Sequence, residues 1–262
     1  MKLTNNTILI TGGTSGIGLA LAERLDEADN QIIILGRNQT KLTQVQQRHP
    51  KFATYQADVS RPETLAALPS WLKTHYPKLN IVINSAGTMR AFSLFDESVS
   101  VNALVSDIQT NLIGTIAVDK LLINQLRTQP EALIVNISSG LANLGVATHP
   151  SYSASKAGVH MFTDALHEQL QSIGATQVHV MELVPPMVAE TNLESVSSTT
   201  APGNMKLPDL ITAALKGMNQ DKKRVNPGLS KGMRLAGKIA PDPAEHRLAT
   251  TMIPQYFPNG LI

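Results

Sequence analysis

The sequence predicts an α/β fold in which helices cover both faces of a doubly wound parallel β-sheet. Two observations support this prediction. Short apolar runs, which are typical of buried strands, alternate along the chain with longer segments of helical character. The runs are apolar throughout rather than alternating with polar residues, as expected of strands buried on both faces of a sheet. Right-handed crossovers between such strands place helices on both faces.

The predicted elements follow one another from residue 7 to about residue 226. The predicted strands are Thr7–Ile10, Gln31–Leu35, Phe52–Ala57, Asn80–Ile83, Ala132–Ile137, Gln177–Leu183 and a short strand near Val225. The predicted helices are Leu19–Leu25, Gln39–Arg48, Pro62–Tyr76, Val101–Leu126, Tyr152–Ser172 and Pro208–Met218. Residues 194–206 have few apolar side chains and are expected to form a loop. The pattern weakens after Asp221, and no helix is expected there.

Length and charge narrow the classes of protein. With 262 residues, the chain corresponds most simply to a single domain, residues 1–262. A net charge of +2 is too small to favour nucleic acid or an anionic membrane as a partner. No apolar run approaches the roughly 18 residues of a membrane span, and a predicted strand begins at Thr7, which leaves no room for a signal peptide. We therefore expect a cytoplasmic protein that binds neither nucleic acid nor membranes.

The residue types also limit the chemistry. The chain has no cysteine, which excludes disulfides, thiolate zinc sites and cysteine nucleophiles. The seven histidines, among them His149, His160 and His167, lack a ligand spacing such as His-Glu-x-x-His. We therefore expect no metal site.

A glycine-rich turn follows the first predicted strand. Gly12, Gly16 and Gly18 lie between the strand Thr7–Ile10 and the helix Leu19–Leu25. Strand, glycine-rich turn and helix is the arrangement that a dinucleotide site requires, because glycines let backbone N–H groups approach a pyrophosphate and the helix N-terminus favours an anion. The spacing Gly-x-x-x-Gly-x-Gly differs from Gly-x-Gly-x-x-Gly, and an ordinary turn between strand and helix is the alternative.

Tyr152 and Lys156 are separated by one helical turn, so they share one face of a predicted helix. A lysine held there favours the phenolate and lowers the pKa of tyrosine from its usual value of about 10. A phenol with a lowered pKa is a usable general acid or base. Tyr-x-x-x-Lys also occurs by chance in many helices, so the assignment depends on the other motifs.

Together these motifs resemble the short-chain dehydrogenase/reductase family. The matching residues run from Thr11 to about Thr191, some two-thirds of the chain, and they occur in the family's order. They are Thr11-Gly12 through Gly18, Asp58-Val59, Asn84-Ser-Ala-Gly87, Asn111, Ser139, Tyr152 and Lys156. Tyr152 follows Ser139 by 13 positions, which is the family's usual separation and favours Ser139 over the neighbouring Ser138. The resemblance implies a Rossmann-type fold.

The resemblance also implies roles for individual residues. A nicotinamide cofactor would contact Gly12, Thr14, Ser15, Gly16, Ile17, Gly18, Arg37, Asp58, Val59, Asn84, Ala86, Gly87, Tyr152, Lys156, Pro185 and Val188. The catalytic residues would be Asn111, Ser139, Tyr152 and Lys156. Asn84 could equally well stabilise the sheet.

The end of the second predicted strand indicates which nicotinamide cofactor is preferred. An acidic residue there would accept a hydrogen bond from the ribose 2′-hydroxyl and repel a 2′-phosphate. None is present, and Arg37 offers a guanidinium instead, which suits a phosphate. The sequence therefore predicts NADP(H) in preference to NAD(H). The alternative is that Arg37 merely caps an exposed loop.

The segment after the sixth predicted strand departs from the family pattern Pro-Gly-x-Val-x-Thr. Pro186 replaces the glycine, which removes an N–H and fixes φ. Val188 is in position to hold the nicotinamide carboxamide by resemblance, whereas Thr191 lies one position late. The Pro-Pro pair resembles that of a bacterial branch of poorly characterised oxidoreductases.

The reaction implied by the resemblance is reduction of a ketone or aldehyde, or oxidation of the alcohol in reverse. Tyr152 would donate the proton, Lys156 would keep its pKa low and bind the nicotinamide ribose, and Ser139 would stabilise the oxygen. Asn111 would position a water near Lys156. Two alternatives remain: a cofactor-retaining epimerase or dehydratase of the same family, and a non-catalytic NAD(P)-sensing regulator.

Substrate recognition and assembly are indicated only in outline. A substrate-binding loop is expected at residues 187–206, with further contacts from residues 88–95 and 141–149. Leu141, Leu144, Val146, Met187 and Leu193 could line an apolar cavity, and few charged residues lie nearby, so a neutral carbonyl or alcohol is the expected partner. By resemblance, pairing of the fourth and fifth predicted helices would give a homodimer or homotetramer, and Phe257 and Ile262 could pack at a subunit contact.

Overall fold

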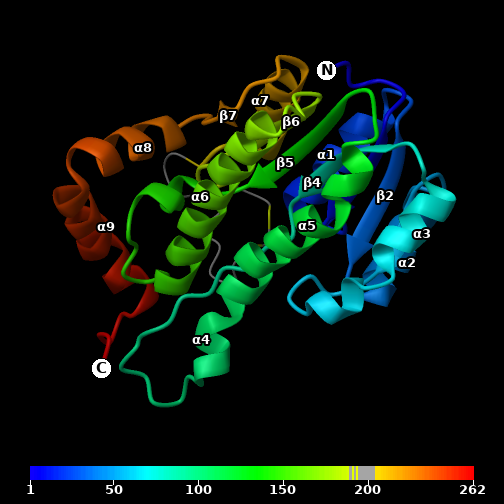
Figure 1. Cartoon of the computed structure of the whole chain (residues 1–262). Coiled ribbons are helices and arrows are strands. Elements are labelled where there is room, and N and C mark those ends of the chain that lie inside the picture. The colour runs from blue at the N-terminus through cyan, green and yellow to red at the C-terminus, as the bar shows by residue number, and fades with distance from the viewer. Residues whose placement is uncertain (189–190, 192, 194–203) are drawn as a thin grey trace.

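A computed structural model of the chain describes residues 1–188, 191, 193 and 204–262. Its centre is a parallel sheet of seven strands in the order β3-β2-β1-β4-β5-β6-β7 (Figure 1). The strands are β1 (Thr7–Thr11), β2 (Gln31–Gly36), β3 (Ala53–Gln56), β4 (Leu79–Asn84), β5 (Ala132–Ile137), β6 (Val178–Leu183) and β7 (Arg224–Val225). The predicted doubly wound parallel sheet is confirmed.

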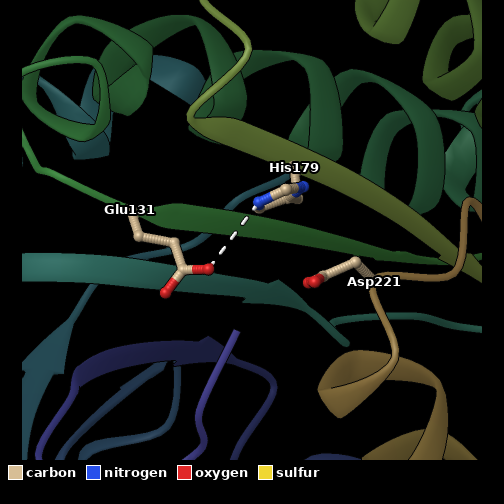
Figure 2. A group of neighbouring side chains, drawn as sticks. All are labelled: Glu131, His179 and Asp221. Carbon is tan, nitrogen blue, oxygen red and sulfur yellow. Dashed lines mark ion pairs between the residues drawn. The ribbon is translucent and has the colours of Figure 1, made fainter.

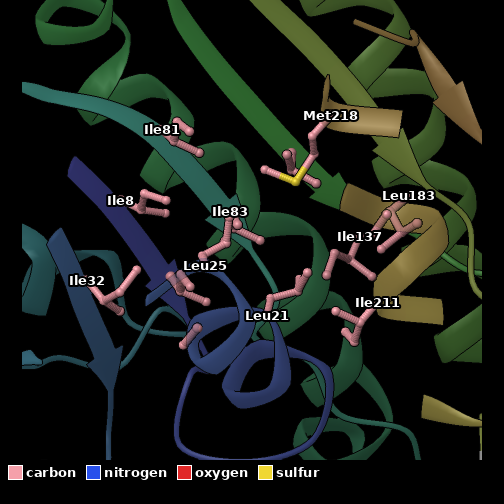
Figure 3. Packing of buried hydrophobic residues seen from close by; sticks show 14 of the residues in the cluster. Ile8, Leu21, Leu25, Ile32, Ile81, Ile83, Ile137, Leu183, Ile211 and Met218 are labelled. Atoms are coloured by element: carbon pink, nitrogen blue, oxygen red, sulfur yellow. The ribbon is translucent and has the colours of Figure 1, made fainter. Parts of the chain in front are cut away.

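Two layers of helices bury the two faces of the sheet in separate apolar clusters. The first layer is α1 (Gly16–Asp26), α2 (Gln39–Arg48) and α7 (Leu207–Asn219). The second layer is α3 (Leu68–His75), α5 (Gly114–Leu126) and α6 (Pro150–Ser172). Figure 3 shows the first cluster, in which Leu25 of α1 lies near Ile8 and Ile32 of the sheet and Leu21 lies near Ile83. None of the helices among the described residues is long and apolar enough to cross a membrane.

The order of the strands defines where a ligand can enter. β1 pairs with β2 on one side and with β4 on the other, so the chain reverses its direction of winding between β1 and β4. In open parallel sheets, ligands bind outside the carboxyl ends of the strands at such a reversal. The segments that follow β1 and β4 therefore frame the expected site.

Two predicted helices are interrupted in the structure. The predicted helix Pro62–Tyr76 consists of a 3₁₀ turn, Pro62–Leu65, and α3, which begins anew with Pro69 in its first turn. Proline lacks an N–H and disfavours a helical residue before it, which accounts for the break. The predicted helix Val101–Leu126 consists of α4 (Val101–Asp107), a π-helical segment (Ile108–Ile113) and α5.

The expectation that no helix follows Asp221 is wrong. The chain continues after β7 into α8 (Ser230–Ile239), which packs on the 3₁₀ turn Gly140–Asn143, and α9 (Pro241–Tyr256). Both helices lie at the end of the molecule opposite α2 and α3 in Figure 1. Gly237 and Pro254 lie inside these helices, and both residue types disfavour a helix interior. Local propensity therefore indicated no helix, and contacts with the rest of the protein decide the structure.

A buried polar cluster joins the middle of the sheet to the second helix layer. Asn84 Nδ2 donates to Asp119 Oδ1 (2.7 Å) and to Asn136 Oδ1 (2.8 Å). Asn136 Nδ2 donates to Asp119 Oδ2 (3.0 Å) and to Thr163 Oγ1 (3.1 Å). Burial raises the pKa of Asp119 to about 7, although the hydrogen bonds from Asn136 and Asn84 oppose the rise. Through these hydrogen bonds Asn84 links β4 to β5 and α5.

The raised pKa of Asp119 predicts how stability depends on pH. Between the unfolded pKa of 3.8 and the folded pKa of about 7, the unfolded chain releases a proton that the folded protein retains. The contribution of protonated Asp119 to the free energy of unfolding is therefore fully present below pH 3.8. It falls by about 1.4 kcal/mol per pH unit as the pH rises from there through about 7. We expect Asp119→Asn to lack this loss, so that the wild type loses about 3 kcal/mol relative to the variant between pH 5 and pH 8.

Urea unfolding at pH 5, 6, 7 and 8 measures this difference. Asp29→Asn, at an exposed position, is the matched control and should follow the wild type at every pH. A constant difference between wild type and Asp119→Asn across this range would contradict the prediction.

Candidate active site

The turn after β1 is built to bring backbone N–H groups to the edge of the sheet. Gly12 has a φ of +65°, and a Cβ on it would lie 2.7 Å from the Cα of Ala86 in the turn after β4. A Cβ on Gly18 would lie 2.7 Å from the carbonyl oxygen of Gly12, so glycine lets α1 approach the turn. Both positions therefore require glycine on steric grounds.

The N-terminus of α1 faces this edge. Gly16 begins the helix with a φ of +53°, and Ser15 precedes it in an extended conformation without a side-chain capping bond. The hydroxyls of Thr14 and Ser15, and the half-buried Ile17, flank the first turn. Uncapped N–H groups and the helix dipole favour an anion here, so the turn fits a dinucleotide pyrophosphate.

The turn after β4 packs against the turn after β1. Thr11 Oγ1 accepts hydrogen bonds from the N–H groups of Ser85 and Ala86, both at 3.1 Å. Thr11 thus joins the two segments that frame the crevice, a role that its place in the motif did not reveal. The side chain of Asn84, by contrast, points into the buried cluster with Asp119. Its position favours a role in stabilising the sheet over a contact with a cofactor.

Tyr152 and Lys156 share one face of α6, and both are buried, at 4% and 5% exposure. Lys156 Nζ donates to the carbonyl oxygen of Ile137 at the end of β5 (2.8 Å) and lies 5.8 Å from the centre of the Tyr152 ring. Burial lowers the pKa of Lys156 from 10.5 to about 8, while the charge of Asp107 opposes this fall. The ammonium therefore stays mostly protonated at pH 7, close to the tyrosine.

Asn111 lies in the π-helical segment and is completely buried. Its Nδ2 donates to Thr88 O and to Ser155 Oγ (both 2.9 Å), and its Oδ1 accepts from Thr88 N (2.8 Å). These bonds hold the chain after β4 against α6. A Cβ on Gly87 would lie 3.3 Å from Asn111 Oδ1 and 3.8 Å from Lys156 Nζ, so the glycine keeps the space beside both side chains open.

Ser139 follows the end of β5 and is 8% exposed. It is extended, with φ −163° and ψ 157°, and its Oγ accepts from Leu141 N (3.2 Å) at the start of a 3₁₀ turn, Gly140–Asn143. Gly140 N donates to Pro185 O (2.8 Å), which joins this turn to the chain after β6. The structure thus gathers Ser139, Tyr152, Lys156 and Asn111 around the carboxyl ends of β4 and β5.

Arg37 and Asp58 lie together at the ends of β2 and β3. Arg37 is exposed, and its Nη1 lies 4.0 Å from Asp58 Oδ2. Asp58 Oδ1 accepts from Ser60 N (3.0 Å) and Ser60 Oγ (2.7 Å), which leaves Oδ2 on the side of Arg37. Val59 is buried against the start of α5, where a Cβ on Gly114 would lie 2.9 Å from it.

The segment after β6 reaches from Pro185 back to the glycine-rich turn. Val188 is buried and forms a bridge with Met205. A Cβ on Gly16 would lie 3.1 Å from the carbonyl oxygen of Thr191, so the segment crosses in front of the N-terminus of α1. Most of the expected loop at residues 187–206 lies outside the described residues. Met187 and Leu193 are described, and both are exposed, at 46% and 39%.

The C-terminal helices form a wall beside the segment that follows Ser139. A Cβ on Gly140 would lie 2.8 Å from Met233 Sδ of α8. Glu245 of α9 accepts a hydrogen bond from Gly145 N (2.7 Å), and the Tyr256 ring lies edge-on to the buried His149 at 4.8 Å. Sequence patterns did not indicate these contacts, because the C-terminal segment was not expected to be helical.

A cavity of about 770 Å³ lies between this wall and α6. Leu141, Leu144 and Val146 line it, together with the face of α6 that carries Ala154 and Ala157. Met187 and Leu193, which were expected to line an apolar cavity with them, are not among its lining residues. The face of α6 that lines the cavity is not the face that carries Tyr152 and Lys156. Three polar residues of α9 also line the cavity: Asp242, Glu245 and His246. The cavity is therefore more polar than the sequence pattern predicted.

One further group of polar side chains lies at the opposite, amino-terminal edge of the sheet. Figure 2 shows Glu131, His179 and Asp221, which lie close enough together to be considered as metal ligands. The amino group of Met1 lies 2.5 Å from Asp221 Oδ1 and 3.6 Å from Glu131 Oε1. Since a cation already pairs with both carboxylates, ion pairing accounts for this group.

Comparison with known proteins identifies the family. The model of the short chain dehydrogenase family matches residues 6–201, so the chain belongs to the short-chain dehydrogenase family and is an enzyme of the oxidoreductase class. An uncharacterized oxidoreductase, DltE of Bacillus subtilis, is 36% identical over 238 residues, which covers 89% of this chain and 92% of DltE. Ketoacyl reductase HetN of a Nostoc species is 28% identical, covering 91% of this chain and 86% of HetN.

Solved structures share the fold at low sequence identity. A short-chain dehydrogenase from Burkholderia cenocepacia in complex with NADP has a TM-score of 0.79 at 20% identity, covering 95% of this chain and 99% of that one. A relative from Burkholderia phymatum in complex with NAD has a TM-score of 0.79 at 19% identity, covering 91% and 95%. At this identity the likeness concerns the fold.

The close approach at Gly12 predicts the effect of a substitution. Alanine at Gly12 and at Gly174 would both occupy a positive φ, +65° and +72°, which costs about 1–2 kcal/mol. Only at Gly12 would the Cβ also meet backbone, because no heavy atom of the described residues lies within 4 Å of a Cβ on Gly174. We therefore expect Gly12→Ala to lower the free energy of unfolding by about 1–3 kcal/mol more than Gly174→Ala.

Urea unfolding of the two variants tests this expectation, with Gly174→Ala as the matched control. Equal losses of stability would contradict the steric role that the structure gives to Gly12.

Proposed function

We propose that the chain is an NADP(H)-dependent oxidoreductase that interconverts a ketone or aldehyde and the corresponding alcohol. The observation that carries the proposal is the position of Tyr152 and Lys156, buried on one face of α6 beside the end of β5. The uncapped N-terminus of α1 and the glycine turn provide a fitting dinucleotide site at the same edge. The proposed catalytic domain comprises residues 1–262, with a substrate-binding loop at 187–206.

In the proposed reaction, Tyr152, Lys156 and Ser139 each have one role. The cofactor, when bound, supplies or accepts a hydride. Tyr152 donates a proton to the carbonyl oxygen in the reducing direction and accepts it in reverse. The Lys156 ammonium lies 5.8 Å from the tyrosine ring and favours the phenolate electrostatically. Ser139 donates a hydrogen bond to the same oxygen, which stabilises the charge that develops there.

Asn111 has a positioning role in this proposal. Its side chain is occupied by Thr88 and Ser155, so it fixes the walls of the site. The π-helical segment that contains it is a common feature of functional sites. We propose that Asn111 thereby shapes the space beside Lys156 in which a water could pass a proton.

The cofactor contacts are proposed on the positions of their residues. Backbone and hydroxyl groups from Gly12 to Gly18 would bind the pyrophosphate. Asp58 and Val59 would lie beside the adenine, Ala86 and Gly87 beside the dinucleotide backbone, and Pro185 and Val188 beside the nicotinamide. The Pro-Pro pair at Pro185 and Pro186 supports the proposed membership of a bacterial oxidoreductase branch.

The proposed substrate is a neutral carbonyl compound or alcohol. The segments expected to contact the substrate, residues 88–95, 141–149 and 187–206, contain few charged residues, which favours a neutral molecule over a phosphorylated or acidic one.

We further propose that two copies of the chain pair through α5 and α6. A groove of about 670 Å³ runs between these helices, lined by Ile116, Ile123, Phe162 and Leu166. Apolar side chains lining an exposed groove are typical of an interface, and a second copy offers the same face in return. A homodimer, or a homotetramer formed by two such pairs, is the proposed assembly.

Tyr152→Phe tests the chemistry, because it removes the hydroxyl and leaves the ring in place. We expect kcat/KM for any carbonyl substrate to fall by about 100-fold or more, with the Kd for NADPH changed by less than about twofold. A panel of ketones and aldehydes, followed at the NADPH absorbance band, measures the first quantity, and fluorescence titration measures the second. Tyr55→Phe, which alters a ring packed against Trp71, is the matched control. Turnover retained by Tyr152→Phe would refute the mechanism.

Arg37→Ala tests the cofactor preference. Hydrogen bonds to a charged group contribute about 1.5–3 kcal/mol, so loss of the guanidinium should lower the NADPH to NADH ratio of kcat/KM by about 10-fold to 100-fold. Arg24→Ala removes an exposed arginine of α1 and should leave the ratio unchanged. An unchanged NADPH to NADH ratio of kcat/KM in Arg37→Ala would refute the proposed preference for NADP(H).

A further inference from the structure

A buried carboxylate, that of Glu182 on β6, lies beside the end of β5. Ser139 is extended, so the side chains of Ser138 and Ser139 point in opposite directions. Ser138 Oγ donates to Oε1 of Glu182 on β6 at 2.5 Å, and the Glu182 side chain is 1% exposed. The backbone of the same segment is anchored by the bonds from Ser138 N to Leu183 O (2.9 Å) and from Gly140 N to Pro185 O.

Two cationic or polar donors hold the other oxygen of this carboxylate. Glu182 Oε2 accepts from His160 Nδ1 of α6 (2.9 Å) and from Arg224 Nε of β7. Arg224 Nη2 also donates to both carboxylate oxygens of Asp164 on α6, each at 2.8 Å. Lys223 lies 3.5 Å from Asp164 at the outer end of the group. Glu182 therefore connects β5, β6, β7 and α6.

The charge of Glu182 fixes the direction of these bonds. Burial raises the pKa of this carboxyl, but the hydrogen bonds from His160, Ser138 and Arg224 outweigh that effect and hold the pKa below its usual value. An ionised carboxylate only accepts hydrogen bonds, so the Ser138 hydroxyl must point toward Glu182. The hydrogen bond that holds the end of β5 therefore has the Ser138 hydroxyl as its donor and the Glu182 carboxylate as its acceptor.

The contacts of α6 with the sheet follow a single face of the helix. Lys156 contacts Ile137 O, His160 contacts Glu182, and Thr163 contacts Asn136. These positions follow one another at helical spacing, i, i+4 and i+7, and Tyr152 continues the same face toward the site. The three contacts therefore set the rotation of the helix that presents Tyr152.

We propose that Glu182 is a positioning residue that fixes Ser139 through Ser138 and the tyrosine-bearing helix through His160. The inference rests on the proposed function, in which Ser139, Tyr152 and Lys156 carry the chemistry. A purely structural role is the competing explanation. Buried ion pairs often contribute little to stability compared with apolar residues of similar volume, so stability alone does not account for this group.

Hydrogen exchange of the segment 137–141 measures the positioning directly and needs no substrate. In Ser138→Ala and in Glu182→Gln we expect the backbone amides at positions 138 and 140 to exchange about tenfold faster, because their bonds to Leu183 O and Pro185 O open more often. Lys223→Met removes the outer lysine, whose side chain does not contact Glu182, and is the matched control, with exchange unchanged. Unchanged exchange in both test variants would overturn the proposal.

Kinetics with a carbonyl substrate of the panel give the second readout. We expect kcat to fall about tenfold in Ser138→Ala and in Glu182→Gln, while the Kd for NADPH stays the same. The kcat of the double variant should fall no further than that of Glu182→Gln, because Glu182→Gln already removes the connection that runs through Ser138. Falls that multiply in the double variant, or an unchanged kcat in either single variant, would overturn the proposal. Ser138→Ala removes one hydroxyl only, so it keeps the test decisive if Glu182→Gln fails to fold.

Ser139→Ala separates this inference from the proposed function. Full turnover in Ser139→Ala would refute the role of Ser139 itself. Loss of turnover in Ser139→Ala together with full activity and unchanged exchange in Ser138→Ala would overturn only the role of Glu182.

Discussion

The hydrogen bond from the Lys156 ammonium to the Ile137 carbonyl is the contact on which the geometry of the site depends. It joins a helix that crosses the face of the sheet to the last residue of a central strand. A buried ammonium is costly unless it has partners, so the helix cannot shift along the strand without losing this bond. Tyr152, one turn earlier on α6, is thereby held at the same edge as the glycine turn. The fixed edge of a parallel sheet thus determines where the reactive groups meet.

Two buried carboxyl groups of this protein, Glu182 and Asp119, differ in the direction of their pKa shifts. Glu182 keeps its charge because His160, Ser138 and Arg224 compensate for burial. Among the described residues, the hydrogen bonds to Asp119 come from the amides of Asn84 and Asn136, which do not offset its burial, so its pKa rises to about 7. Asp119 lies away from the site and joins the sheet to α5, whereas Glu182 supports the strand that ends at Ser139. The difference lies in the cations that surround each carboxylate.

The sequence was sufficient for most of the fold because the strands are short apolar runs bounded by turns. The order of the motifs also brought Ser139, Tyr152, Lys156 and Asn111 to one edge, since the carboxyl ends of parallel strands meet there. Three features were missed. The break at Pro69 follows from the chemistry of proline and could have been found. The π-helical segment around Asn111 leaves no periodic signal in six residues. The helices α8 and α9 form despite glycine and proline inside them, because tertiary contacts outweigh local propensity.

The C-terminal wall has a consequence for how the enzyme is made. The strands β1 to β6 are complete once residue 183 has been synthesised, and their contacts are mostly between neighbouring segments of the chain. The bond from Ser93 Oγ to Leu261 O joins residues 168 positions apart, and Tyr256 reaches back to His149. Proteins are synthesised from the N-terminus, so these long-range contacts form last. The sheet that holds the reactive groups can therefore exist before the wall beside them, and the cavity next to α6 is complete only after α9 has been synthesised.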